Sequence, residues 1–105
     1  MAEERNVNRI DELRQQIDDI DTRLVELLSR RAACALAIGH EKKLIGLEVY
    51  QPSREAEVLS HVQQINPGPL DNGAMKRLFE RIIDEARRLE RVADTDEETE
   101  QREEI

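Results

Sequence analysis

Residues 8–43 read NRIDELRQQIDDIDTRLVELLSRRAACALAIGHEKK, and the fold follows from the spacing of the apolar residues within them. These residues recur in alternating steps of three and four, which is the a/d seam of a helical heptad pattern. The seam consists of Ile10, Leu13, Ile17, Ile20, Leu24 and Leu27. Its next positions in phase are Arg31, Cys34 and Ile38. The pattern therefore predicts one long helix with a guanidinium in its packing seam.

The length of this helix predicts a partner. About 36 residues of helix would extend over roughly 54 Å. A compact domain of this chain length has a radius of gyration of only about 13 Å. The helix would overhang any single-chain globule, and its apolar seam around Ile10, Leu13 and Ile17 would need cover. A second copy of the chain is the simplest cover, so we expect an obligate homodimer in which the long helices pack together.

Two shorter helices are expected after the long one. Pro52 suits the first turn of a second helix, and the segment NPGP at residues 66–69 ends it. A third helix is expected over residues 71–93, and Glu90 continues its apolar face as a carboxylate. That face consists of Met75, Leu78, Phe79, Ile82, Ile83, Ala86 and Leu89. Because strand-like runs of β-branched or aromatic residues are absent, we predict an all-α fold with three helices per chain.

Polar segments flank this helical domain, which we expect over residues 8–93. Residues 1–7 are predicted to be a frayed N-terminus, and residues 94–105 an acidic, disordered tail. The tail contains seven acidic residues and one arginine, so it carries −6 of the formal charge of −8. The remaining −2 disfavours a basic face for nucleic acid. Without an apolar signal segment or a run of membrane-spanning length, we expect a cytoplasmic protein with no membrane partner.

Neither metal nor covalent chemistry is indicated by the residue pattern. Cys34 is the only cysteine, and His40 and His61 lack partners at metal-ligand spacing. Ser29 and Ser53 have no helical histidine neighbour and no glycine elbow, so a nucleophilic triad has no support. We therefore expect no metal and no cofactor.

The cations of the long helix raise the question of a ligand. Arg31 and Lys42 would be about 16 Å apart and within about 20° of one another around the helix, so one small ligand could lie between them. Arg14 would be about 42 Å from Lys42, so only an antiparallel partner helix, crossing near Val25, could bring it to the same site. On the residues alone, Arg14 and Lys42 are ordinary solvated charges. Arg31 differs, because a charge in an apolar seam tends to be paired or functional.

The ordered set of motifs resembles the all-helical AroQ class of chorismate mutases, over roughly residues 8–92. The motifs are Leu13-Arg14-x-x-Ile17-x-x-Ile20-Asp21-x-x-Leu24-x-x-Leu27-Leu28-x-x-Arg31, Lys42, Arg54-Glu55 and Arg77-Leu78-Phe79-x-x-Ile82-Ile83. The resemblance implies an intertwined three-helix homodimer that converts chorismate to prephenate, a step towards phenylalanine and tyrosine. It also implies a Claisen rearrangement within one dianionic molecule, with no covalent intermediate, metal or cofactor.

The resemblance also implies roles for individual residues. Arg31 and the partner subunit's Arg14 look like two clamps for the substrate carboxylates, because the planar guanidinium binds a carboxylate through two hydrogen bonds. Lys42 looks like the cation at the breaking ether bond. Glu55 resembles the acceptor of the substrate hydroxyl, and Arg54 a supporting member of the polar wall.

Three further positions depart from the family pattern. Gln51 stands where an Asp is common, which changes hydroxyl recognition there. Ala86 replaces a Ser that contacts a substrate carboxylate in some members. Glu90 stands where some members have Gln and others Glu. An ionised Glu has no proton to donate to the ether oxygen, so Glu90 would act when protonated. We expect Arg31, Lys42 and Glu90 to be the catalytic residues.

Two other functions remain open from the sequence. Isochorismate-pyruvate lyases are similar in scaffold and in their cationic pocket, and the sequence separates them poorly from mutases. The second is a non-enzymatic helical dimerisation module, which would dimerise through the same seam and whose functional segment would be the acidic tail. That module predicts that a seam charge such as Arg31 can be replaced by an apolar residue without loss.

Overall fold

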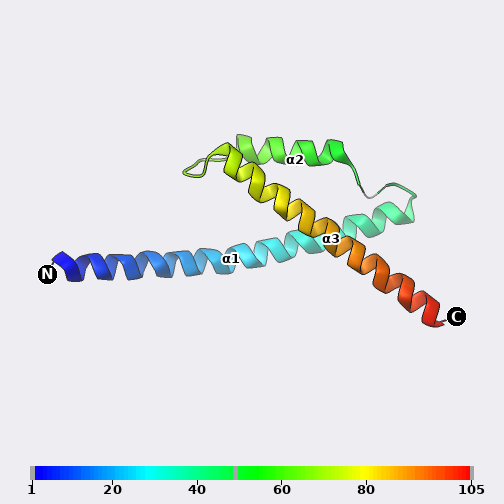
Figure 1. The fold of residues 1–105 in the computed structure, drawn as a ribbon, viewed down its shortest axis with the longest axis horizontal. Coiled ribbons are helices and arrows are strands. Elements are labelled where there is room, and N and C mark those ends of the chain that lie inside the picture. The colour runs from blue at the N-terminus through cyan, green and yellow to red at the C-terminus, as the bar shows by residue number, and fades with distance from the viewer. Residues whose placement is uncertain (1, 49, 105) are drawn as a thin grey trace. The chain divides into compact units, whose positions relative to one another are not determined.

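The structure, a computed structural model, describes residues 2–48 and 50–104. Three helices contain most of these residues. They are α1 (Ala2–Leu44), α2 (Pro52–Gln64) and α3 (Asn72–Glu104) (Figure 1). Within those residues there is no strand. The prediction of an all-α fold of three helices, the first very long, is confirmed.

The first and third helices are longer than the sequence pattern predicts. α1 begins at Ala2 rather than Asn8, and α3 continues past Ala93 to Glu104. Glutamates in the first turn of α1 suit the positive end of the helix dipole, and the acidic segment after Ala93 is rich in helix-forming glutamate. Both helices cross the boundaries that we expect at residues 7 and 93. The division into a domain with flanking segments stays a prediction.

The chain divides into two compact units, and the boundary between them in the sequence falls within α1. The first unit ends at Arg31 and consists of α1 alone. Every described side chain from residue 3 to residue 30 is exposed, including the whole predicted seam. Leu13, the most covered seam residue, is still 42% exposed, and Leu27 is 56% exposed. One copy of the chain therefore leaves this apolar seam in water.

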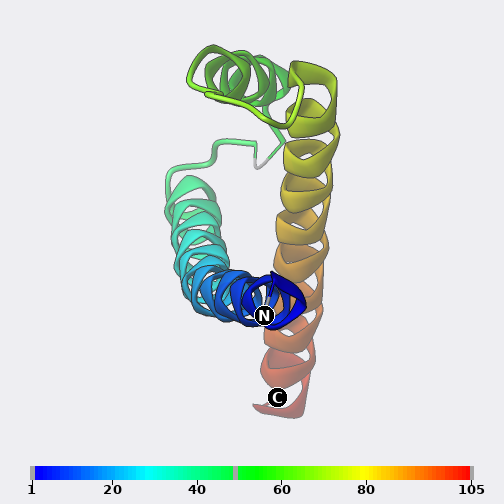
Figure 2. The same ribbon diagram turned by 90° about the vertical axis from the view of Figure 1, so that its left-hand side faces the viewer.

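The second unit begins at Ala32 and contains the end of α1 together with α2 and α3. α2 packs beside the first half of α3, as Figures 1 and 2 show from two sides. Val62 of α2 is buried in this contact region, with 6% exposure. The apolar face predicted for α3 is mostly half-buried, but Leu78 and Leu89 of that face are exposed.

A hydrogen-bonded turn fixes where α3 begins. The Asn66 side chain donates to the Leu70 carbonyl at 2.7 Å and accepts from the Gly68 amide at 3.1 Å. Gly68 has φ +75°, a conformation that favours glycine. The Asp71 carboxylate accepts from the Ala74 amide at 2.6 Å and so caps the first turn of α3.

Among the described residues, no helix combines the length and the apolar character that a bilayer crossing requires.

Candidate active site

The centre of the candidate site is the close approach of α1 and α3 at Gly39 and Glu90. Gly39 is buried, and a Cβ built on it would lie 3.6 Å from Glu90 Cδ and 3.8 Å from Oε2. The Glu90 side chain therefore occupies the space beside a residue that has no side chain of its own. The structure thus places the carboxyl group of Glu90 against the backbone of α1, near the end of that helix.

Burial raises the pKa of Glu90, because the ionised form loses hydration there. Three cations oppose this rise by favouring the ionised form: Lys42, then Lys43, then Arg87. Desolvation is the largest cause, so the carboxyl group is held towards its protonated form despite the neighbouring positive charge. A protonated carboxyl group can donate a hydrogen bond, which an ionised one cannot.

Two of the three predicted catalytic residues lie together in this unit. Lys42 is half-buried on α1, one turn after Gly39, and acts electrostatically on Glu90 of α3. The neighbouring Lys43 forms an ion pair with Asp94 of α3, so it is engaged further along that helix. An ammonium group and a carboxyl group whose pKa is raised thus lie in the same part of this unit, and both are groups that can act on a negatively charged oxygen atom.

Glu55 lies on the first turn of α2, and its partner is a residue that the sequence reasoning missed. The half-buried Glu55 forms an ion pair with Arg87 of α3. The Arg87 guanidinium also lies over the Tyr50 ring, with its central carbon 4.6 Å from the ring centroid. Its position three residues before Glu90 places both on one side of α3, but the sequence gives no sign of its partners Glu55 and Tyr50.

The remaining predicted residues of this unit differ in exposure. Arg54 is exposed and forms an ion pair with Glu57 at 3.2 Å, one turn along the same helix. Gln51 is exposed and stands at the N-cap of α2, where its side chain makes no capping hydrogen bond. Ala86 is half-buried on α3. Within this unit, the structure thus partly covers Ala86 and leaves Gln51 and Arg54 facing solvent.

The two arginines of the first unit that are predicted for the site, Arg14 and Arg31, are in different settings. Arg14 is exposed and lies 3.9 Å from the Asp11 carboxylate, a pair one turn apart on the helix surface. Such exposed pairs contribute little to stability, so this one leaves the guanidinium able to bind a carboxylate ligand. Arg31, at the end of the unit, is half-buried.

Across the described residues, no three His, Cys, Asp or Glu side chains come together as possible metal ligands. Cys34 is a free, exposed thiol.

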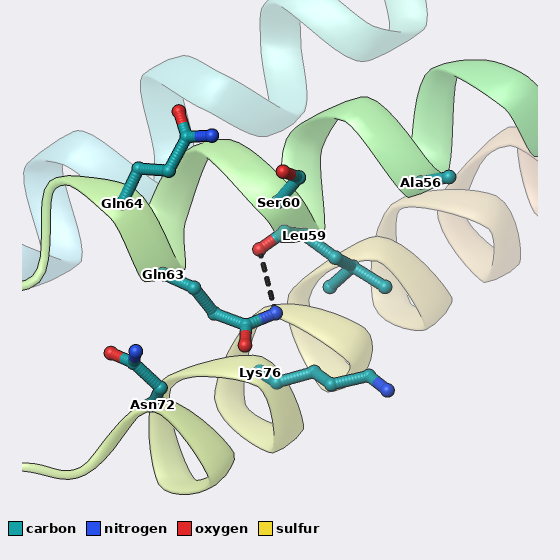
Figure 3. Close-up of a pocket in the computed structure, with 7 residues that line it drawn as sticks. All are labelled: Ala56, Leu59, Ser60, Gln63, Gln64, Asn72 and Lys76. Atoms are coloured by element: carbon teal, nitrogen blue, oxygen red, sulfur yellow. Dashed lines mark hydrogen bonds between the residues drawn. The ribbon is translucent and has the colours of Figure 1, made fainter.

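One groove of the second unit lies away from the predicted site residues. It has a volume of about 460 Å³ and lies between α2 and α3 (Figure 3). Polar and apolar groups both line it, from Ala56, Leu59, Ser60, Gln63, Gln64, Asn72 and Lys76. The Gln63 amide donates a hydrogen bond to the Leu59 carbonyl at 3.0 Å. None of the residues predicted for the site lines this groove.

One family model matches most of this chain. The model of the family described as chorismate mutase type II matches residues 13–91. Over 83 residues the chain is 42% identical to the bifunctional chorismate mutase/prephenate dehydratase of Stutzerimonas stutzeri, covering 74% of this chain and 23% of that protein. It thus spans about a quarter of the length of the bifunctional relatives that it matches.

Shorter proteins match over more of their own length. The intracellular chorismate mutase of Mycobacterium tuberculosis H37Rv is 34% identical over 71 residues, which is 68% of each chain. The solved structure of chorismate mutase (form II) from Thermus thermophilus superposes with a TM-score of 0.76. Its identity is 34%, over 79% of this chain and 94% of that chain. Because the family match extends from α1 through α2 into α3, this chain belongs to the chorismate mutase type II family.

Proposed function

We propose that this chain is a chorismate mutase, which rearranges chorismate to prephenate. The observation that carries the proposal is the approach of Glu90 to Gly39 beside Lys42, with the carboxyl group held towards its protonated form. In the rearrangement the ether C–O bond breaks while a C–C bond forms, and negative charge develops on the ether oxygen. A protonated Glu90 and the Lys42 ammonium can both donate hydrogen bonds to that oxygen.

The reaction takes place within one molecule, so the protein needs no nucleophile and no cofactor for it. Its contribution is to hold a flexible dianion in the reactive conformer and to stabilise the developing charge. Arg31, half-buried on α1, is proposed to hold one carboxylate of the substrate. The second clamp is proposed to be the partner subunit's Arg14, since a planar guanidinium matches the geometry of a carboxylate.

A homodimer is part of this proposal. The seam of α1 is exposed from Ile10 to Leu27 in a single chain. Fully burying one Leu or Ile side chain stabilises by about 1.5–3 kcal/mol, so covering the whole seam favours association strongly. A second copy, whose own α1 has the same seam, supplies a complementary surface with two-fold symmetry.

Recognition of the rest of the substrate is assigned to α2 and α3. Glu55 is proposed to accept the substrate hydroxyl, with Gln51 and Arg54 as supporting polar groups near the start of α2. Ala86 offers no hydroxyl to a substrate carboxylate, which leaves more of that contact to the cations. The product would feed phenylalanine or tyrosine synthesis, and the intracellular chorismate mutase of Mycobacterium tuberculosis supports a cytoplasmic location.

Product identification tests the proposal. The purified chain is incubated separately with chorismate and with isochorismate, and prephenate, salicylate and pyruvate are measured. We expect prephenate from chorismate, at a rate that disappears in a Lys42→Gln variant purified in parallel as a control for contaminating enzymes. Salicylate and pyruvate from isochorismate, without prephenate from chorismate, would instead show an isochorismate-pyruvate lyase. Absence of turnover with either compound would contradict both enzymatic functions.

A further inference from the structure

Arg87 of α3 contacts three groups from three segments of the second unit. It forms an ion pair with Glu55 of α2, and its guanidinium lies 4.6 Å from the centroid of the Tyr50 ring in the preceding loop. On its own helix, Nη1 lies 3.8 Å from the Asp84 carboxylate. The Arg87 side chain is 34% exposed and that of Glu55 is 25% exposed. Arg87 therefore ties α2 and the loop before it to α3.

The chemistry of the guanidinium explains why one residue can make these contacts together. Its edge donates hydrogen bonds to a carboxylate while its face stacks on an aromatic ring. Both Glu55 and Arg87 are largely covered, so solvent screens their attraction less than that of an exposed pair such as Arg54 and Glu57. The ion pair gives the Glu55 carboxylate, whose oxygens accept hydrogen bonds, a defined orientation.

Arg87 also acts on Glu90, which lies three residues further along α3. The cations that face Glu90 are Lys42 and Lys43 of α1 and Arg87 of its own helix. Lys43 also forms an ion pair with Asp94, and Arg87 forms one with Glu55. Each of these cations favours the ionised carboxylate, in opposition to burial. Arg87 is thus connected both to the proposed hydroxyl acceptor and to the proposed proton donor.

We propose that Arg87 is a positioning residue of the reaction, which orients Glu55 for the substrate hydroxyl and holds α2 and the loop before it against α3 near Glu90. This inference rests on the proposed function, because it takes the roles of Glu55 and Glu90 from it. Arg87 itself acts through these two carboxyl groups and through Tyr50. The proposal therefore predicts a change in substrate affinity and a change in pH dependence, from a single substitution.

Three variants separate this role from a structural one. Arg87→Gln removes the charge and the ion pair, and Arg87→Lys keeps the charge but loses the planar fork and the stacking. Arg88→Gln is the matched control, because Arg88 is the next residue of α3, is exposed, and pairs with Glu85 at 3.3 Å rather than with the site. Rates are measured against chorismate concentration from acid to alkaline pH.

For Arg87→Gln we expect KM to rise about three- to tenfold, as the loss of a charge-assisted contact predicts, with kcat kept. The alkaline fall in activity should move to higher pH, since a cation that favours the ionised Glu90 is gone. Arg87→Lys should raise KM similarly but leave the alkaline fall near its wild-type position. Arg88→Gln should change neither quantity.

A carboxyl-carbon NMR titration of Glu90 in the unliganded protein provides a readout that does not need turnover. We expect a higher pKa for Glu90 in Arg87→Gln than in the wild type or in Arg88→Gln. Unchanged KM and an unchanged titration would overturn the inference. A second result would also overturn the inference: kcat and kcat/KM both fall, while the pH at which activity is lost stays the same. Arg87 would then contact the reacting substrate itself. A wild-type chain without turnover counts against the proposed function, and the titration still tests the link between Arg87 and Glu90.

Discussion

Gly39 of α1 and Glu90 of α3 lie in contact, with the Glu90 carboxyl carbon 3.6 Å from the place where a Gly39 Cβ would be. That separation is an ordinary van der Waals distance, so the contact is close without being strained. The space beside Gly39 therefore admits a methyl group but no larger side chain without moving the Glu90 carboxyl group. The contact places the Glu90 carboxyl group against α1, and burial raises the pKa of that group.

The first prediction concerns the size of the residue at position 39. Gly39→Ala should keep activity within about threefold and raise the free energy of unfolding by about 0.5–1 kcal/mol, since alanine is the better helix former. Gly39→Leu should displace Glu90 and lower kcat/KM about a hundredfold or more, as the loss of one oxyanion donor does. Denaturant unfolding and steady-state kinetics measure both effects. A folded but inactive Gly39→Ala chain would contradict this account of the contact.

The second prediction concerns pH. If protonated Glu90 donates to the ether oxygen, activity should fall as pH rises through its raised pKa, because the ionised form cannot donate. In Glu90→Gln the amide donates at every pH, so the alkaline fall should flatten. The measurement is kcat/KM from acid to alkaline pH for both chains. A wild-type profile that is already flat over that range would count against the role of Glu90.

Stability should depend on the same proton, which gives the third prediction. Burial raises the pKa of Glu90 in the folded chain above its unfolded value, so the folded state holds the proton more firmly. The resulting stabilisation is fully present below the unfolded pKa and is lost as pH rises through the folded pKa. Relative to Glu90→Gln, the wild type should therefore become less stable from acid to neutral pH. Urea unfolding of both chains at several pH values checks the sign, and a constant difference would contradict it.

Periodicity predicted the parts of this site that depend on a single helix. The seam of α1 identified Arg31 as an unusual charge, and the apolar face of α3 identified Glu90. Both inferences need only the phase of one helix. Glu55 pairs with a residue of α3, whereas its neighbour Arg54 is exposed. Helical phase explains this difference, but only once it is known that α2 packs on α3.

Arg87 was out of reach of the sequence for a different reason. Its partners, Glu55 and Tyr50, belong to α2 and the loop before it, so the contact depends on tertiary structure. In the sequence pattern Arg87 looks the same as its neighbour Arg88, and only the folded chain covers one and exposes the other. Helix ends were also missed, because helix-forming glutamates extend α1 and α3 beyond the apolar pattern.

A fourth prediction separates an enzyme from a dimerisation module. Arg31→Leu restores an apolar residue to the seam of α1, so association should be kept or strengthened. If Arg31 holds a substrate carboxylate, kcat/KM should fall at least about thirtyfold, because a covered charge pair loses one member. Sedimentation and kinetics on the same preparation measure the two effects. Full activity in an associated Arg31→Leu chain would favour the module.

The last prediction is that one active site takes residues from two chains. Arg14→Ala and Arg31→Ala chains should each be nearly inactive alone. If Arg14 acts on the partner's site, a mixed dimer has one site with both arginines and one site with neither. Random pairing makes half of the dimers mixed, so co-expression or subunit exchange should restore about a quarter of wild-type activity. Mixing the wild type with the double variant is the control, since its mixed dimers contain no complete site. No recovery from the two single variants, with mixed dimers confirmed by mass spectrometry, would show that Arg14 does not act across the dimer.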